Sequence, residues 1–242
     1  MPLSRFRFLC ALGLIAAGTS GVGLLVLNKT SLVERHVEAR LPVIATDMLT
    51  SPSGAVLLAG NSHAEIAGHS GLPSCTPWMN AGIAGTKARN YRTAIERIKA
   101  PARFRSAVLF IGTNDIMRRD NPLSQSSKMR FAADVSHILG WLRGRADEVI
   151  VAAVPPIGAA ATRRREPAAV SVYSDILRRL CQSSGCRFED PFIGIRGDGN
   201  GLAGDEALPD AIHLADYPAM LHILNICHDI GRHSLVSPAT WK

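Results

Sequence analysis

Short, uniformly apolar runs alternate along the chain with longer segments in which apolar residues recur every three or four positions. Glycine or proline follows such runs at residues 55–59, 107–111 and 148–154. A weaker strand candidate lies at 77–81, and a short fifth candidate at 186–189 lies just before Pro191. Strands that are apolar on both faces are typical of a parallel sheet covered on both sides. The runs therefore predict a parallel sheet of five strands.

The longer segments predict amphipathic helices that cover this sheet. Apolar residues fall at helical spacing in residues 89–99, 129–143, 169–183 and 217–232. Strands that alternate with helices are typical of a three-layer α/β/α domain. In such domains functional groups gather at the carboxyl ends of the strands.

The first 40 residues predict a membrane segment and a connector. The twenty residues from Phe8 to Leu27 carry no charge, and a helix of that length spans roughly 30 Å, enough to cross a bilayer core. The apolar region of a cleaved signal peptide is shorter, although small residues at 16–18 offer a cleavage site. We expect residues 1–40 to hold an uncleaved transmembrane helix, or a signal peptide, with a polar connector, and residues 41–242 to form one domain.

Composition and charge exclude several classes of protein. With 47% hydrophobic and 19% charged residues, the chain is neither disordered nor a multi-span membrane protein. Of the net charge of +7, three charges lie in residues 1–40, which hold five Lys and Arg and two Asp and Glu. The basic run at residues 163–165 lacks interleaved aromatic residues and predicts a solvated loop before a helix. Nucleic acid is therefore not an expected partner.

The cysteines bear on the compartment of the domain. Four of the five lie in the predicted domain: Cys75, Cys181, Cys186 and Cys227. An even number is compatible with disulfides in an oxidising compartment, and buried thiols are the alternative. Cys181 and Cys186 bracket a predicted turn and would form a bridge if their α-carbons come close enough. No Cys-x-x-Cys pair is present, so we expect no metal site. We expect a domain outside the cytoplasm, membrane-anchored, or secreted if the N-terminal segment is cleaved.

Polar groups suited to acyl transfer follow the predicted strands. Gly60-Asn61-Ser62 follows the first strand, and a serine becomes nucleophilic when a base and oxyanion donors accompany it. A glycine loop at residues 80–86 follows the second strand, and Gly112-Thr113-Asn114-Asp115 follows the third. Asp210 and His213 precede the last predicted helix, at a spacing that lets the carboxylate orient the imidazole. Each element alone has a common structural explanation, but their order and placement favour a serine hydrolase.

These four elements resemble the sequence blocks of the SGNH hydrolase family, also called GDSL-type esterases and lipases, over about residues 54–232. The resemblance implies a flavodoxin-like sandwich with five parallel strands, and hydrolysis or transfer of ester acyl groups without metal or organic cofactor. It implies Ser62 as nucleophile and His213 as general base, oriented by Asp210. The implied oxyanion hole consists of the Ser62 and Gly85 backbone N–H groups and the Asn114 side-chain amide. Gly82 competes with Gly85, and the spacing from Asn80 favours Gly85.

The sequence departs from the family pattern beside the nucleophile. Asn61 replaces the usual Asp, and His63 replaces the usual Leu; His63 could line the pocket or cap a helix. Because a fold does not settle function, a catalytically silent carbohydrate- or ligand-binding domain is the alternative. A nucleotide-binding protein is disfavoured, since the glycine-rich segment 194–204 does not open a helix after a strand. The expected partner is an ester-bearing small molecule, lipid or glycan, and the oligomeric state stays open.

Overall fold

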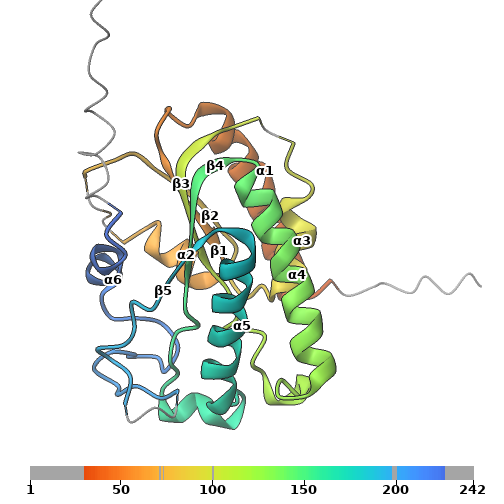
Figure 1. The fold of residues 1–242 in the computed structure, drawn as a ribbon, viewed down its shortest axis with the longest axis vertical. Coiled ribbons are helices and arrows are strands. Elements are labelled where there is room, and N and C mark those ends of the chain that lie inside the picture. The colour runs from red at the N-terminus through yellow and green to blue at the C-terminus, as the bar shows by residue number, and fades with distance from the viewer. Residues whose placement is uncertain (1–29, 71, 73, 100, 198–200, 227–242) are drawn as a thin grey trace, which may run out of the picture. The chain divides into compact units, whose positions relative to one another are not determined.

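The strands form one parallel sheet. The structure is a computed structural model that describes residues 30–226 except 71, 73, 100 and 198–200 (Figure 1). The strands are β1 (Val56–Gly60), β2 (Trp78–Gly82), β3 (Phe104–Phe110), β4 (Ala146–Ala152) and β5 (Arg187–Glu189). Their order is β2-β1-β3-β4-β5, with every pair parallel. The predicted five-stranded parallel sheet is confirmed, and this order is that of flavodoxin-like domains.

Helices cover both faces of the sheet. They are α1 (Leu32–Thr50), α2 (Ser62–Ala67), α3 (Ala88–Ile95), α4 (Gln125–Arg143), α5 (Ala168–Ser184) and α6 (Tyr217–Ile223), with 3-10 turns η1 (Arg118–Asp120) and η2 (Ala159–Arg163). One core joins α1, α3, α4 and α5 to one face, and a second core joins α2 and α6 to the other (Figure 1). Successive residues of β1 alternate between them, since Leu57 packs in the first core and Leu58 in the second. Burial on both faces explains why β1 is apolar throughout, whereas β5, at the edge of the sheet, is only partly buried and holds Arg187 and Glu189.

Helix α1 begins inside the segment that was expected to be a connector. Ser31 caps it: its hydroxyl accepts the Glu34 N–H, and the Glu34 carboxylate accepts the Ser31 N–H at 2.7 Å. Its buried side chains recur at spacings of four, three and four: Val37, Leu41, Ile44 and Met48. The compact unit therefore begins at Ser31 rather than at residue 41.

Two other expectations concern the ends of the chain. The predicted transmembrane segment, Phe8 to Leu27, lies outside the described residues, and within the described residues no helix is both long and apolar enough to cross a bilayer. The last helix was expected at 217–232, but α6 ends at Ile223, and residues 227–232 lie outside the described part of the chain.

The structure decides between the alternatives for one cysteine pair. Cys181 and Cys186 form a disulfide across the end of α5, with their α-carbons 4.6 Å apart. Cys75 is also disulfide-bonded, whereas Cys227 lies outside the described residues. The bridge agrees with the prediction that a turn lies between Cys181 and Cys186 and brings their α-carbons close together.

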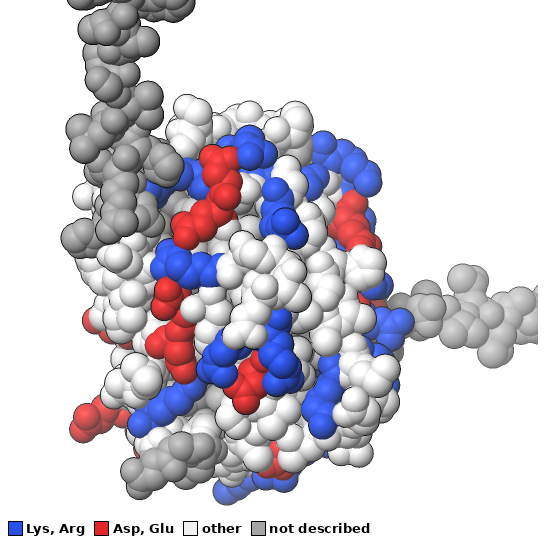
Figure 2. All heavy atoms as spheres, viewed as in Figure 1, with Lys and Arg blue, Asp and Glu red and all other residues white. Residues whose placement is uncertain are grey.

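Charges of both signs are interspersed on the face of the domain shown in Figure 2. Elsewhere in the domain as well, ion pairs such as Arg118 with Glu166, at 2.6 Å, and Arg187 with Glu148, at 2.9 Å, bring opposite charges together. On this face the positive net charge is therefore not gathered into one basic patch.

Candidate active site

Ser62 lies at the carboxyl end of β1, as the first residue of α2. Gly60 has φ +126°, and a Cβ there would lie 1.8 Å from the carbonyl oxygen of Phe110, so only glycine fits this turn. Buried Asn61 caps α2 by accepting the His63 N–H at 3.0 Å. The Ser62 N–H consequently lies in the first helical turn, where backbone donors have no acceptor within the helix.

Ser62, His213 and Asp210 form a continuous hydrogen-bonded chain. The Ser62 Oγ lies 2.9 Å from His213 Nε2, and His213 Nδ1 lies 2.6 Å from Asp210 Oδ2. The other Asp210 oxygen accepts the N–H groups of Ile212 and His213, at 2.9 and 2.7 Å. The fold thus brings together a serine and a histidine that are 151 residues apart in sequence.

The surroundings of Asp210 keep its carboxylate ionised. Burial alone would raise the pKa of Asp210, but hydrogen bonds from the backbone and ring of His213 and from Ile212 outweigh it and lower this pKa to about 2. The ionised carboxylate accepts a hydrogen bond from the Nδ1–H of His213, which leaves Nε2 as the acceptor facing the Ser62 hydroxyl. A general base for serine requires this tautomer.

The loop between β2 and α3 distinguishes the two candidate glycines. The Gly82 N–H donates to Asn80 Oδ1 at 2.9 Å, and the Ala84 N–H donates to Glu65 Oε2 at 2.6 Å. Gly85 has φ +76°, and its N–H has no acceptor among the described residues. Gly85 therefore presents an available donor, whereas Gly82 does not.

Asn114 follows β3 and reaches this loop. Its Nδ2 donates to the carbonyl oxygen of Thr86 at 3.1 Å, so the amide lies beside Gly85. The carboxylate of Asp115 binds the N-terminus of α3 instead, because both its oxygens accept the Ala88 N–H, at 3.0 and 3.2 Å. The segment after β3 thus places an amide beside the loop between β2 and α3, and a carboxylate at the first residue of α3.

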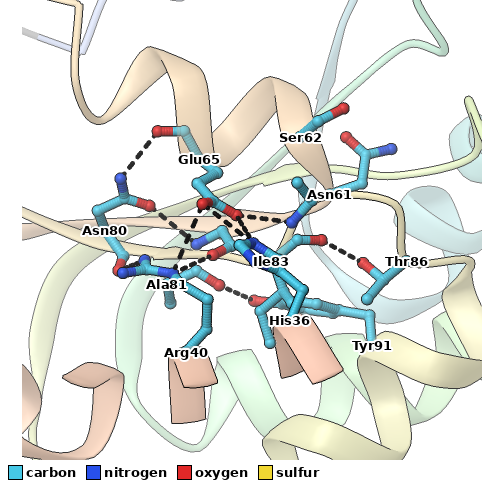
Figure 3. A network of polar contacts seen from close by, with 12 residues as sticks. His36, Arg40, Asn61, Ser62, Glu65, Asn80, Ala81, Ile83, Thr86 and Tyr91 are labelled. Carbon is cyan, nitrogen blue, oxygen red and sulfur yellow. Dashed lines mark hydrogen bonds and ion pairs between the residues drawn. The ribbon is translucent and has the colours of Figure 1, made fainter. Parts of the chain in front are cut away.

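A polar network joins α1, α2 and the loop between β2 and α3, which we call the donor loop because it holds Gly85 (Figure 3). The Glu65 carboxylate that accepts the Ala84 N–H also lies 2.8 Å from His36 Nε2 and 3.8 Å from Arg40 Nε. Arg40 donates to the carbonyls of Gly82 and Asn80, at 3.2 and 3.1 Å. Sequence reasoning missed this network, because its members are common polar residues whose partners lie 15 to 42 residues away.

His63 is a buried neighbour of the hydrogen-bonded chain. Its Nδ1 lies 3.0 Å from the Tyr217 hydroxyl, and its ring centroid is 5.4 Å from that of His213. Burial, with a smaller contribution from the charges of His213 and Arg165, lowers the pKa of His63 to about 3. His63 therefore stays neutral near neutral pH and lies beside His213 without carrying charge.

Arg165 departs from the solvated loop predicted for residues 163–165. Arg163 and Arg164 are exposed, but the side chain of Arg165 is partly buried. Its Nε donates to the Thr113 carbonyl at 2.9 Å, and its Nη2 donates to Asn114 Oδ1 at 3.0 Å. Composition alone did not distinguish the inward arginine from its two exposed neighbours.

A serine, histidine and aspartate linked in this order, beside available amide donors at the carboxyl edge of a parallel sheet, form the arrangement that a serine hydrolase requires. The chain belongs to the GDSL-like lipase/acylhydrolase family, whose model matches residues 64–222. The match includes Gly85, Asn114, Asp210 and His213 and begins two residues after Ser62. The resemblance seen in the sequence is confirmed, and the protein is an ester-hydrolysing enzyme.

Solved structures share this fold at low sequence identity. A GDSL-like lipase from Bacteroides thetaiotaomicron is 14% identical with a TM-score of 0.61, over 81% of this chain and 98% of that one. The lipase/acylhydrolase from Enterococcus faecalis is 16% identical with a TM-score of 0.55, over 74% and 96%. An acetylxylan esterase from Geobacillus stearothermophilus is 13% identical with a TM-score of 0.50, over 78% and 97%. No curated protein sequence matches the chain.

Proposed function

We propose that the protein is a serine esterase that forms an acyl-enzyme on Ser62. The observation that carries this proposal is the chain from the Ser62 Oγ to His213 Nε2, at 2.9 Å, and from His213 Nδ1 to Asp210, at 2.6 Å. These distances suit direct proton transfer from the hydroxyl to the imidazole. Asp210 orients the ring and stabilises the imidazolium that results.

The proposed reaction has two halves. In the first, His213 Nε2 takes the hydroxyl proton while the Ser62 Oγ attacks the ester carbonyl carbon. The tetrahedral intermediate collapses, the bond to the alcohol oxygen breaks, and the His213 imidazolium protonates the departing alcohol. In the second half, His213 takes a proton from water, or from an acceptor hydroxyl, whose oxygen attacks the acyl carbon. The bond from that carbon to the Ser62 Oγ then breaks, and the His213 imidazolium returns a proton to the Oγ. Water gives hydrolysis, and an acceptor hydroxyl gives acyl transfer.

We assign the stabilisation of the negative oxygen to three donors. They are the backbone N–H groups of Ser62 and Gly85 and the Nδ2 of Asn114. Support comes from the available N–H of Gly85 and from the hydrogen bond that holds Asn114 Nδ2 at Thr86. Such donors act mainly on the transition state, in which the carbonyl oxygen gains charge.

We further propose that the enzyme acts outside the cytoplasm, anchored through residues 8–27, on acyl groups of envelope glycans or lipids. The Cys181–Cys186 disulfide supports an oxidising compartment. Protease treatment of spheroplasts tests this location: digestion of the domain is expected, and full protection would overturn it. Acetylated glycans compared with esters of increasing chain length test the substrate class.

Turnover of p-nitrophenyl acetate tests the catalytic assignment. Ser62→Ala is expected to lower kcat by at least about 10⁴-fold, because no other group replaces the nucleophile. Ser126→Ala is the matched control, since Ser126 is exposed on α4. Retained turnover in a folded Ser62→Ala variant would remove Ser62 from the mechanism.

A further inference from the structure

The side-chain amide of Asn114 accepts one hydrogen bond through its oxygen and donates another through its nitrogen. Its oxygen accepts from Arg165 Nη2 at 3.0 Å, and its nitrogen donates to the Thr86 carbonyl at 3.1 Å. A guanidinium only donates and a carbonyl only accepts, so this pair of partners excludes the flipped amide. One N–H of Nδ2 is bound to Thr86, and the second is left for a ligand.

Backbone pairing fixes the position of Arg165. Residues 164–166 lie against residues 116–118: the Arg118 N–H donates to the Arg164 carbonyl at 2.8 Å, and the Glu166 N–H donates to the Ile116 carbonyl at 2.9 Å. The Arg165 Nε also donates to the carbonyl of Thr113, the residue before Asn114, at 2.9 Å. The guanidinium is therefore held to both the backbone and the side chain of the loop after β3.

Arg165 interacts electrostatically with the Asp210 carboxylate but forms no ion pair among the described residues. Among the described residues no carboxylate lies within 4.0 Å of its guanidinium. Partial burial of an unpaired cation costs free energy, which shows in the lowered pKa of this group. A cation on the amide oxygen polarises the amide and strengthens the N–H at its other end as a donor.

We propose that Arg165 is a positioning residue of the oxyanion hole, which orients the Asn114 amide and strengthens its remaining N–H toward the negative oxygen of the intermediate. This inference rests on the proposed function. Because the oxyanion forms only after attack, the effect of Arg165 falls on kcat rather than on KM.

A double-mutant cycle between Arg165 and Asn114 tests this role with p-nitrophenyl acetate. Asn114→Ala is expected to lower kcat about 10²–10³-fold, as for loss of one oxyanion donor. Arg165→Met is expected to lower kcat roughly 10- to 100-fold, with KM changed less than about threefold. In the double variant kcat is expected to stay within about twofold of Asn114→Ala, because Arg165 has then lost the group through which it acts. Arg164→Met, an exposed neighbour, is the control.

The outcomes separate this inference from the proposed function. If the two single effects multiply in the double variant, or if Arg165→Met equals Arg164→Met, Arg165 does not act through Asn114. If Asn114→Ala itself leaves kcat unchanged while Ser62→Ala abolishes turnover, the oxyanion assignment fails instead. Thermal unfolding checks that each variant is folded; if Arg165→Met is not, Arg165→Lys takes its place in the same cycle, with the same non-additivity expected.

Discussion

Replacing Glu65 by alanine removes the carboxylate that accepts the Ala84 N–H in the donor loop between β2 and α3. The Glu65 side chain is only 15% exposed, and it accepts the Ala84 N–H at 2.6 Å, one residue before Gly85. Its loss also leaves Arg40, whose side chain is 14% exposed, without the carboxylate at 3.8 Å. The substitution therefore perturbs the loop between β2 and α3, which holds Gly85, without changing Ser62, His213 or Asp210.

The size of the effect follows from these contacts. A hydrogen bond to a charged group contributes about 1.5–3 kcal/mol, and the partly exposed pair of Glu65 with His36 adds under about 1 kcal/mol. We expect Glu65→Ala to lower the free energy of unfolding by about 2 kcal/mol, which lowers Tm by about 4–8 °C in a domain of this size. Displacement of the Gly85 N–H is expected to lower kcat roughly 10- to 100-fold.

Thermal unfolding and p-nitrophenyl acetate kinetics measure both effects. Glu65→Gln keeps an oxygen acceptor for the Ala84 N–H and is expected to retain more of both stability and kcat. The control is Glu38→Ala, which removes an exposed carboxylate of α1 that pairs with Arg97 at 2.5 Å. A Glu65→Ala enzyme with the Tm and kcat of Glu38→Ala would refute the reasoning.

Two further substitutions test the electrostatics of the site. Asp210→Asn is expected to lower kcat roughly 10³–10⁴-fold with the fold intact, because an amide neither holds the required tautomer nor stabilises the imidazolium; steady-state kinetics with circular dichroism check this. His63 has a pKa of about 3 in the folded protein and about 6.5 when unfolded, so between these values only the unfolded chain binds the proton and stability falls as pH falls. Between pH 7 and pH 5 the free energy of unfolding in urea should therefore fall by about 2 kcal/mol less in His63→Gln than in the parent protein. An equal fall in both proteins would contradict the buried neutral imidazole.

The sheet and the triad were predictable because their signals are local. Runs such as 107–111 are apolar throughout, short and followed by glycine, and the short length with the flanking glycine favours a buried strand over a helix. Ser62, Asn114 and His213 each follow a strand or precede a helix, and the parallel order brings strand ends to one edge. Residue type and place in the chain were therefore enough to nominate them.

The parts that escaped prediction depend on contacts between distant segments. Helix α1 was not predicted, because charged residues separate its apolar positions. Ser31 and Glu34 form a capping box, and this pattern in the sequence could have indicated the start of the helix. Arg165 and Glu65 gain their roles from partners 51 and 19 residues away, Asn114 and Ala84. No periodicity or motif marks such pairs, since only the folded loops bring them into contact.

Fluorophosphonate labelling followed by peptide mass spectrometry tests the central claim most directly. The reagent reacts with a serine that has been activated as a nucleophile, whatever the natural substrate is. The account predicts one adduct, on Ser62, that is absent from Ser62→Ala and strongly reduced in His213→Ala. A folded protein that takes no label, or takes it on another serine and keeps it in Ser62→Ala, would contradict the account; the first result would favour a catalytically silent binding domain.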